Sequence, residues 1–179
     1  MDKMDPDKEL MRLISNGDQT AMKAIYDRYA DSICGFARSW LSDPFEAADV
    51  MQETLMDVWR SADRFDGRSS AKTWIFSIAR NKAIDRNRKG KKTITQEADV
   101  EISDDAPDPE AVMEAFQDVA RVRACIETLS PNHRSVIHLA FFDDLSYPEV
   151  AILEGKPVGT IKTRIMHAKK LLMRCLQRS

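Results

Sequence analysis

The chain has 179 residues, a net charge of −2 and an ordinary hydrophobic content of 43%. This length suits one domain or two small ones, with enough apolar residues to form a core. No apolar run approaches the ~20 residues that span a membrane, and the charged N-terminus lacks the apolar segment of a signal peptide. We therefore expect a cytoplasmic protein without membrane insertion.

Charge is distributed unevenly along the chain. Residues 60–92 hold eleven bases and three acids, residues 93–120 hold nine acids and no base, and residues 155–179 hold seven bases and no acid. Two basic segments separated by an acidic one indicate two nucleic-acid contacts, joined by a linker that nucleic acid would repel.

The three cysteines are odd in number and far apart in sequence. We therefore expect Cys34, Cys125 and Cys175 to be buried thiols rather than a disulfide framework. Their spacing relative to the three histidines matches no zinc site. No glycine-rich phosphate loop or nucleophile elbow is present either. We expect no metal, no cofactor and no enzymatic activity.

The N-terminal half has helical periodicity throughout. Asp18 is the predicted N-cap of a helix over 19–41, which buries Ile25, Tyr29, Ile33, Phe36 and Trp40. The run Ser42-Asp43-Pro44 begins a helix that extends to about residue 62. Its predicted core stripe consists of Val50, Leu55, Val58 and Trp59.

A loop around Gly67 leads to a third helix, over about 71–88, capped by Ser69 or Ser70. Its predicted inward residues are Ile75, Ile78, Ala79 and the stem of Lys82, with Trp74 nearby. Gly90 ends this helix, and the acidic residues and prolines of 91–109 indicate an extended linker. Helices resume near Pro109 and run to Leu129, and another begins at Ser130-Pro131 and runs to Phe142.

Residues 145–164 predict a helix-turn-helix. Ser146 and Glu149 form a capping box, Gly155 supplies the turn, and Pro157 begins the second helix. One face of that helix is predicted to be buried and carries Ile161, Ile165, Ala168, Leu172 and Cys175. A basic amphipathic helix after a tight turn suits the DNA major groove, although such a helix is often only a solvated surface helix.

These elements predict an all-α fold. It consists of two small helical domains, 8–91 and 112–178, joined by a flexible acidic linker, 92–111. Two further segments carry candidate sites. In DVMQETLMDVW (49–59) a polar helix face is either solvated or a partner contact. In residues 64–92 the aromatic residues Phe65, Trp74 and Phe76 alternate with basic ones, which suits unstacked bases, although aromatic residues can equally form core.

Together these segments resemble the extracytoplasmic-function (ECF) class of sigma-70 transcription initiation factors. DVMQETLMDVW resembles region 2.2, FDGRSSAKTWIFSIARNKAIDRNRK (65–89) resembles regions 2.3 and 2.4, and LSPNHRSVIHLAFFDDLSYPEVAILEGKPVGTIKTRI (129–165) resembles region 4. The resemblance covers nearly the whole chain. It implies a sigma-2 helical bundle and a sigma-4 helix-turn-helix.

The resemblance also implies partners and residue roles. The region 2.2 helix would dock on the β′ clamp helices of core RNA polymerase through Asp49, Gln52, Glu53 and Asp57. The β flap would hold region 4, and an anti-sigma factor would control the protein, as in a stress response. The acidic linker would thread a basic channel of the polymerase, although a plain tether is as good an interpretation.

Promoter contacts follow in the same way. The loop that captures a flipped −10 base would be Phe65, Asp66, Gly67, Arg68, Ser69, Ser70, Ala71 and Lys72. Asn81 and Asp85 would read the −10 element, while Arg80, Arg86, Arg88 and Lys89 would hold phosphates. The −35 element would be read by Lys162, Thr163, Met166 and His167, with Thr160, Arg164 and Lys170 beside them. Many family members carry a strong donor where this chain has Met166 and His167, which indicates a −35 preference of its own.

Two alternatives to a sigma factor remain open from the residues alone. A two-domain helix-turn-helix repressor would bind operators without polymerase, as a dimer on a palindrome. An antagonist of a sigma factor would explain the two basic segments poorly.

Overall fold

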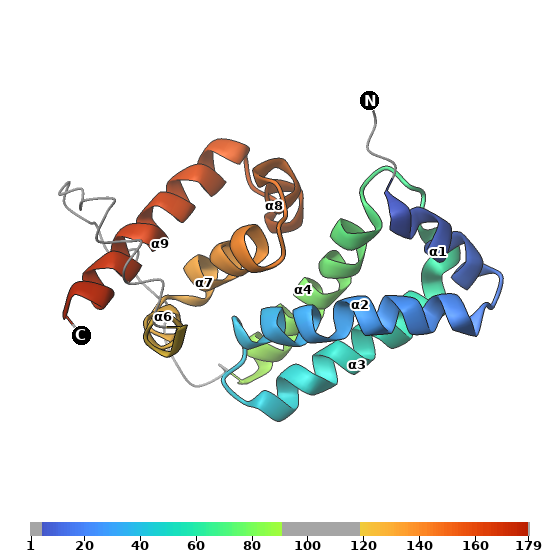
Figure 1. Cartoon of the computed structure of the whole chain (residues 1–179), viewed down its shortest axis with the longest axis horizontal. Helices are drawn as coiled ribbons and strands as arrows, with labels where there is room; N and C mark the ends of the chain where they lie inside the picture. Colours follow the sequence, from blue (N-terminus) through green and yellow to red (C-terminus); the bar gives the residue numbers. More distant parts are fainter. Residues whose placement is uncertain (1–4, 91–118, 179) are drawn as a thin grey trace. The chain divides into compact units, whose positions relative to one another are not determined.

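A computed structural model describes residues 5–90 and 119–178 (Figure 1). Every regular element within those residues is a helix, which confirms the all-α class. The chain divides into two compact units, Met1–Lys92 and Thr93–Ser179, and each is described by itself. The expected linker, 92–111, and the start of the second expected domain at residue 112 lie outside the described residues. None of the described helices has both the length and the apolar character of a membrane span.

Residues 5–90 of the first unit form four α-helices and one short 3-10 helix. These are α1 (Pro6–Ser15), α2 (Gln19–Arg38), α3 (Pro44–Ser61), η1 (Ala62–Arg64) and α4 (Ala71–Gly90). Asp5, Asp18 and Asp43 each accept a backbone hydrogen bond at the start of a helix, which confirms the predicted cap of α2 and the predicted start of α3. Ser70 caps α4 by accepting a hydrogen bond from the Thr73 amide at 3.1 Å.

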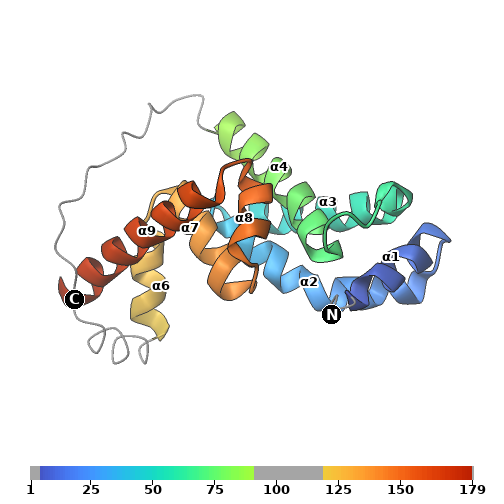
Figure 2. The ribbon, with the colours of Figure 1, turned by 90° about the horizontal axis from the view of Figure 1, so that it is seen from above.

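In the first unit, helix α3 packs against both α2 and α4, and α2 also contacts α4 (Figure 2). The predicted core is largely confirmed, because Ile25, Tyr29, Ile33, Phe36, Val50, Leu55, Val58, Ile75 and Ala79 are buried. Trp40 and Ile78 are only partly buried.

Two aromatic predictions in this unit need correction. Trp59 is 37% exposed, because the buried stripe of α3 runs through Thr54 and Val58 and turns the next residue outward. Phe76, a candidate for base contact, is fully buried, and its ring centroid lies 5.6 Å from that of Phe36 in an edge-on contact. Phe76 is therefore a core residue.

A buried polar cluster ties α1 to α2. The Tyr29 hydroxyl donates a hydrogen bond to the carboxylate of Asp7, and Arg28 forms an ion pair with the same carboxylate. Asp7 is 3% exposed and Tyr29 is 6% exposed. Burial raises the pKa of Tyr29 to about 12, because the phenolate would lose its hydration there.

The second unit contains α6 (Val119–Glu127), α7 (Pro131–Ile137), the π-helical turn η2 (His138–Phe142), α8 (Tyr147–Glu154) and α9 (Val158–Arg178). Ser130 caps α7 as predicted. The helix predicted to run to Phe142 therefore changes to wider π geometry at His138. In Figures 1 and 2, α8 lies beside the N-terminal end of α9 and α6 beside its C-terminal half.

The predicted helix-turn-helix is present. The Ser146 hydroxyl accepts from the Glu149 amide at 3.4 Å, and the Glu149 carboxylate accepts from the Ser146 amide at 2.9 Å, which completes the capping box. Gly155 has φ of +60°, although a Cβ there would meet no atom within 4 Å. Glycine is therefore favoured by the backbone angle rather than by lack of space. On α9, Ile161, Ile165, Ala168 and Leu172 are buried as predicted.

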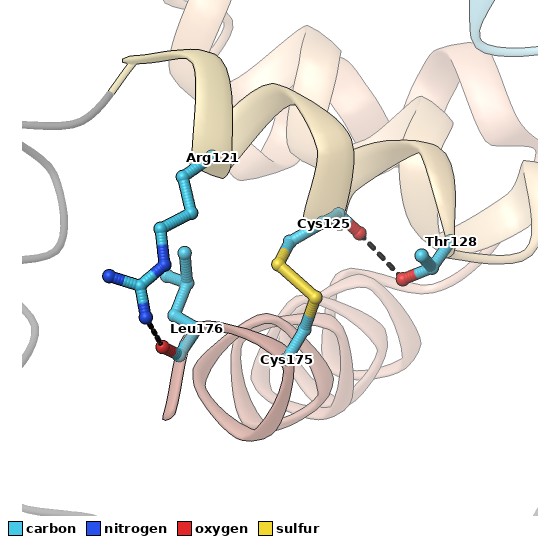
Figure 3. The surroundings of a disulfide bond; sticks show 5 residues. All are labelled: Arg121, Cys125, Thr128, Cys175 and Leu176. Atoms are coloured by element: carbon cyan, nitrogen blue, oxygen red, sulfur yellow. Dashed lines mark hydrogen bonds between the residues drawn. A yellow bond between two sulfur atoms is a disulfide. The ribbon is translucent and has the colours of Figure 1, made fainter. Parts of the chain in front are cut away.

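The expectation of three thiols is wrong for two of the cysteines. Cys125 of α6 and Cys175 of α9 form a disulfide, with their Cα atoms 5.8 Å apart (Figure 3). Fifty residues separate the two cysteines in sequence, but α6 packs against α9 and brings them together. The Arg121 guanidinium also donates a hydrogen bond to the Leu176 carbonyl across the same contact (Figure 3). Cys34, in the first unit, is a free, partly buried thiol.

Candidate nucleic-acid interface

The acidic face of α3 is paired with two cations of α4. Lys82 Nζ lies 2.7 Å from a carboxylate oxygen of Asp57 and 3.7 Å from one of Glu53. The Arg86 guanidinium lies 3.1 Å from Asp49 and forms a second ion pair with Glu53. We call these five residues the α3–α4 charge ladder. The carboxylates follow one another at four-residue intervals on α3, so they share one face of the helix.

The ladder changes the expected role of Arg86, which sequence reasoning assigned to DNA phosphates. Burial lowers the pKa of the Arg86 guanidinium, and hydrogen bonds from it to Asp49 and Glu53 raise that pKa, with a net rise. The guanidinium is therefore engaged within the protein. Gln52 lies on the exposed side of α3, outside the ladder.

Sequence reasoning missed Phe45 and predicted Trp59 to be core, yet both are exposed apolar residues of α3. Phe45 is 80% exposed, Met56 is 49% exposed and Trp59 is 37% exposed. Exposed apolar side chains beside a charged face are typical of a protein-binding surface. No such signal marked Phe45 in the sequence, because an aromatic residue in the first turn of a helix can lie on either the buried or the exposed face.

The loop before α4 is held in place from three sides. The Phe65 and Trp74 rings lie 5.6 Å apart. The Gly67 carbonyl accepts a hydrogen bond from Lys8 Nζ at 2.9 Å, and Asp5 accepts one from the Ala71 amide at 2.7 Å. Sequence reasoning did not connect Asp5 and Lys8 with this loop, because they precede it by about sixty residues.

Within the loop, polar side chains are arranged around the turn. Asp66 accepts a hydrogen bond from the Arg68 amide at 3.0 Å and pairs with its guanidinium at 3.0 Å. The Arg68 side chain is 90% exposed. Gly67 has φ of +70°, in the left-handed region that glycine adopts without strain. Ser69, Ser70 and Lys72 are partly exposed, whereas Ala71 is buried.

Helix α4 presents one exposed polar face. Asn81, Asp85 and Arg88 are all exposed and follow at intervals of four and three residues, so they lie on the same side of the helix. Arg80 instead points toward Trp40, with its guanidinium carbon 5.9 Å from the ring centroid. The structure thus groups the two predicted −10 readers with Arg88 and separates Arg80 from them.

Helix α9 presents the predicted outer face of the helix-turn-helix. Thr160, Lys162, Thr163 and Met166 are exposed, while His167 and Lys170 are partly exposed. A shallow groove of about 340 Å³ follows this face and is lined by Tyr147, Lys162, Ile165, Met166, Lys169, Lys170 and Met173. Apolar side chains flanked by lysines suit the floor of a groove that faces thymine methyls and phosphates.

Arg164 does not belong to that outer face. Its guanidinium lies 3.4 Å from the carboxylate of Glu154, which is 5% exposed. The Ser135 hydroxyl donates a hydrogen bond to the same carboxylate at 2.9 Å. Within the described residues, no cluster of His, Cys, Asp or Glu has the arrangement of a metal site.

Comparison with known proteins identifies the family. Residues 25–93 match the family model "Sigma-70 region 2", and residues 120–172 match "Sigma-70, region 4". The ECF RNA polymerase sigma factor RpoE of Cereibacter sphaeroides is 37% identical over 158 residues, which is 87% of each chain. The chain belongs to the ECF sigma factors of the sigma-70 family.

Further relatives agree over nearly the whole length. The ECF sigma factor SigW of Bacillus subtilis is 31% identical over 95% of this chain and 96% of its own. A solved structure of CnrH in complex with the cytosolic domain of CnrY matches with TM-score 0.71 and 25% identity, over 97% of this chain and 98% of that one. The protein is thus a transcription initiation factor that directs RNA polymerase to promoters. The alternative prediction, a repressor that acts without polymerase, is rejected.

Proposed function

We propose that this sigma factor docks on core RNA polymerase through α3 and holds the promoter at two points. The loop of residues 65–72 and the exposed face of α4 would hold the −10 element, and the outer face of α9 would read the −35 element. The observation that carries this proposal is that each unit has an exposed polar face, on α4 in the first unit and on α9 in the second. Asn81 lies on the first face and Lys162 on the second.

Melting at −10 requires bases to leave the stack. Unstacking costs a few kcal/mol per base, and a site that binds only the flipped base offsets this cost. Phe65 and Trp74 supply aromatic surface for such a base, and Arg68 supplies an exposed cation for its phosphate. Binding energy would therefore drive melting, and this chain would perform no hydrolysis. Since its partners are polymerase and promoter DNA, it would work in the cytoplasm.

At −35, Lys162 can donate hydrogen bonds to guanine O6 and N7, which discriminates by ~1–3 kcal/mol. Thr160, Thr163, His167 and Lys170 would complete the contacts with bases and phosphates. Arg164 would support α9 through Glu154 rather than reach the backbone directly.

An anti-sigma factor is the second proposed partner. One structure similar to this chain is CnrH in complex with the cytosolic domain of CnrY. Another is the sigma factor RpoE in complex with the anti-sigma factor NepR from Bartonella quintana. It matches with TM-score 0.66 and 25% identity, over 87% of this chain and 96% of that one. We propose that a protein of this kind holds the present sigma factor inactive until a stress signal. In the active complex, the β flap of the polymerase would hold region 4 of the sigma factor.

The test is in vitro transcription with core polymerase over a randomised promoter library. We expect transcripts to share one −10 and one −35 motif at fixed spacing. Asn81→Ala should reduce transcription in proportion to the match at −10, and Lys162→Ala should relax specificity at one −35 position. Equal loss on every promoter variant would count against base reading by either residue.

Docking is tested with Gln52→Arg. This exposed residue lies outside the charge ladder, so its replacement leaves the ion pairs between α3 and α4 intact. An added positive charge should weaken binding to a basic polymerase surface. Co-purification of Gln52→Arg with core at the wild-type level would reject α3 as the docking helix. Gln19→Arg, an exposed change at the start of α2, serves as the control.

A further inference from the structure

The α3–α4 charge ladder connects the proposed polymerase face with the proposed −10 reader. Its three carboxylates belong to α3, and its two cations belong to α4, one turn apart. Arg86 lies one residue beyond Asp85 and two before Arg88, both of which are exposed on α4. The same carboxylates are therefore needed by two partners, an internal pair of cations and a basic surface outside.

Exposure along the ladder is asymmetric. The side chains of Lys82 and Arg86 are 23% and 26% exposed, whereas those of Glu53 and Asp49 are 49% and 60% exposed. Asp57 is intermediate at 38%, so each carboxylate is more open to solvent than the cation with which it pairs. A basic partner can therefore reach the carboxylates directly, while a phosphate that approaches Arg86 comes close to the negative charge of Asp49 and Glu53.

Glu53 is the central member of the ladder, because it pairs with both Lys82 and Arg86. Partly exposed ion pairs of this kind contribute little to stability, so a change of partner costs little free energy. A carboxylate has about four acceptor positions, so it can begin to bind a new cation before it loses the old one.

We propose that Arg86 is a conditional phosphate contact: the carboxylates of Asp49 and Glu53 hold it away from DNA in the free sigma factor, and engagement of α3 by a basic surface releases it to a promoter phosphate. This inference rests on the proposed function, in which α3 is the docking helix. It gives Arg86 a conditional role in promoter binding, in place of the constant phosphate contact expected from sequence.

The test removes the carboxylates without the polymerase. The full-length Asp49→Asn, Glu53→Gln variant should bind a fluorescein-labelled oligothymidylate about three- to fivefold more tightly than wild type. The measurement is fluorescence anisotropy across a salt titration. One newly available cation should make the slope of log affinity against log salt steeper by ~0.7 on a single strand.

Two controls separate release of Arg86 from a general change in charge. Asp31→Asn with Glu46→Gln removes two exposed carboxylates of the first unit that form no ion pair among the described residues, and it should give a smaller gain with no change in slope. Adding Arg86→Gln to the ladder variant should abolish the gain. Adding Arg88→Gln should lower the affinity but preserve the gain relative to Arg88→Gln alone.

The outcomes are distinct. A gain equal to that of the Asp31, Glu46 control, or a gain that survives Arg86→Gln, overturns the inference while wild-type transcription with core leaves the proposed function intact. Failure of the wild-type protein to bind core rejects the proposed function itself. If the double variant does not fold by circular dichroism, Glu53→Gln alone tests the same exchange, because it removes the carboxylate shared by both cations.

Discussion

The guanidinium of Arg164 lies 3.4 Å from the buried carboxylate of Glu154, and this pair joins the two helices of the helix-turn-helix. Glu154 ends α8, and Arg164 lies in the second turn of α9. The Ser135 hydroxyl of α7 donates to the same carboxylate. One carboxylate therefore connects α7, α8 and α9, which explains why Arg164, a basic residue in the second turn of α9, points inward.

Replacement of Glu154 should destabilise the second unit. Glu154→Ala removes the acceptor of both Ser135 and Arg164, and leaves a largely buried guanidinium without this partner. We expect the free energy of unfolding to fall by about 3 kcal/mol, measured by urea denaturation followed by circular dichroism. Lys162→Ala, on the exposed face of α9, should leave the denaturation midpoint unchanged; an equal loss in both variants would contradict a structural role specific to Glu154.

The disulfide between Cys125 and Cys175 should add stability to the purified, oxidised protein. In the chain-entropy model, a crosslink across 50 residues lowers the conformational entropy of the unfolded chain. This raises the free energy of unfolding by about 4 kcal/mol. Reduction with dithiothreitol should lower the urea midpoint of the second unit, and the Cys125→Ser, Cys175→Ser variant should unfold at that lower midpoint with or without reductant.

Cys34→Ser provides the matched control for the disulfide. Cys34 is a free thiol in the first unit, so its replacement should leave the response to reductant intact. A midpoint that does not move on reduction of the wild-type protein would show that packing of α6 on α9, together with the Arg121 hydrogen bond to Leu176, suffices without the crosslink.

Tyr29 should make the first unit lose stability at high pH. Burial raises the pKa of its phenol to about 12 in the folded state, against an ordinary 10.0. A group whose folded pKa is raised contributes its full stability below the unfolded pKa, and that contribution is lost as pH rises through the folded value. We therefore expect the free energy of unfolding to decline between about pH 10 and pH 12, by about 2 kcal/mol.

Comparison with Tyr29→Phe isolates this effect from the titration of lysines. The phenylalanine variant has no phenol to ionise, so its unfolding free energy should decline less over the same pH range, measured by urea titration at each pH. Tyr26→Phe, at a residue 48% exposed, should follow the wild-type curve. Parallel curves for wild type and Tyr29→Phe would contradict the assignment.

The local signals in the sequence predicted helix starts well. Asp18 and Ser146 cap helices as predicted, and Ser70 is the cap of the two serines considered, because a cap depends on residues within one turn. Helices also begin at the predicted runs Ser42-Asp43-Pro44 and Ser130-Pro131. The buried stripes of α2 and α9 were also predicted, since their apolar residues repeat at intervals of three and four residues.

Contacts between distant residues were beyond these signals. The disulfide, the Asp5 and Lys8 contacts with the loop of residues 65–72, and the pairing of Arg86 and Lys82 with α3 all depend on how helices pack. Periodicity predicts which face of α4 is polar, but it does not distinguish a cation that faces solvent from one that faces a carboxylate of the neighbouring helix. For that reason Arg86 and Arg164 were both placed on DNA, and the structure places both within the protein.

Met166 is expected to determine part of the −35 preference through the thymine methyl group. Its side chain is 47% exposed and lines the apolar groove of α9 together with Tyr147 and Ile165. Loss of one buried methyl contact costs about 0.8 kcal/mol, or roughly a fourfold change in affinity. Replacing thymine by uracil at each −35 position in turn, in a promoter selected by the holoenzyme, should weaken binding at one position by about this factor. In Met166→Ala the penalty at that position should disappear, while Lys170→Ala should weaken both templates equally and keep their ratio. A uracil penalty that persists in Met166→Ala would assign thymine recognition to another residue of the groove.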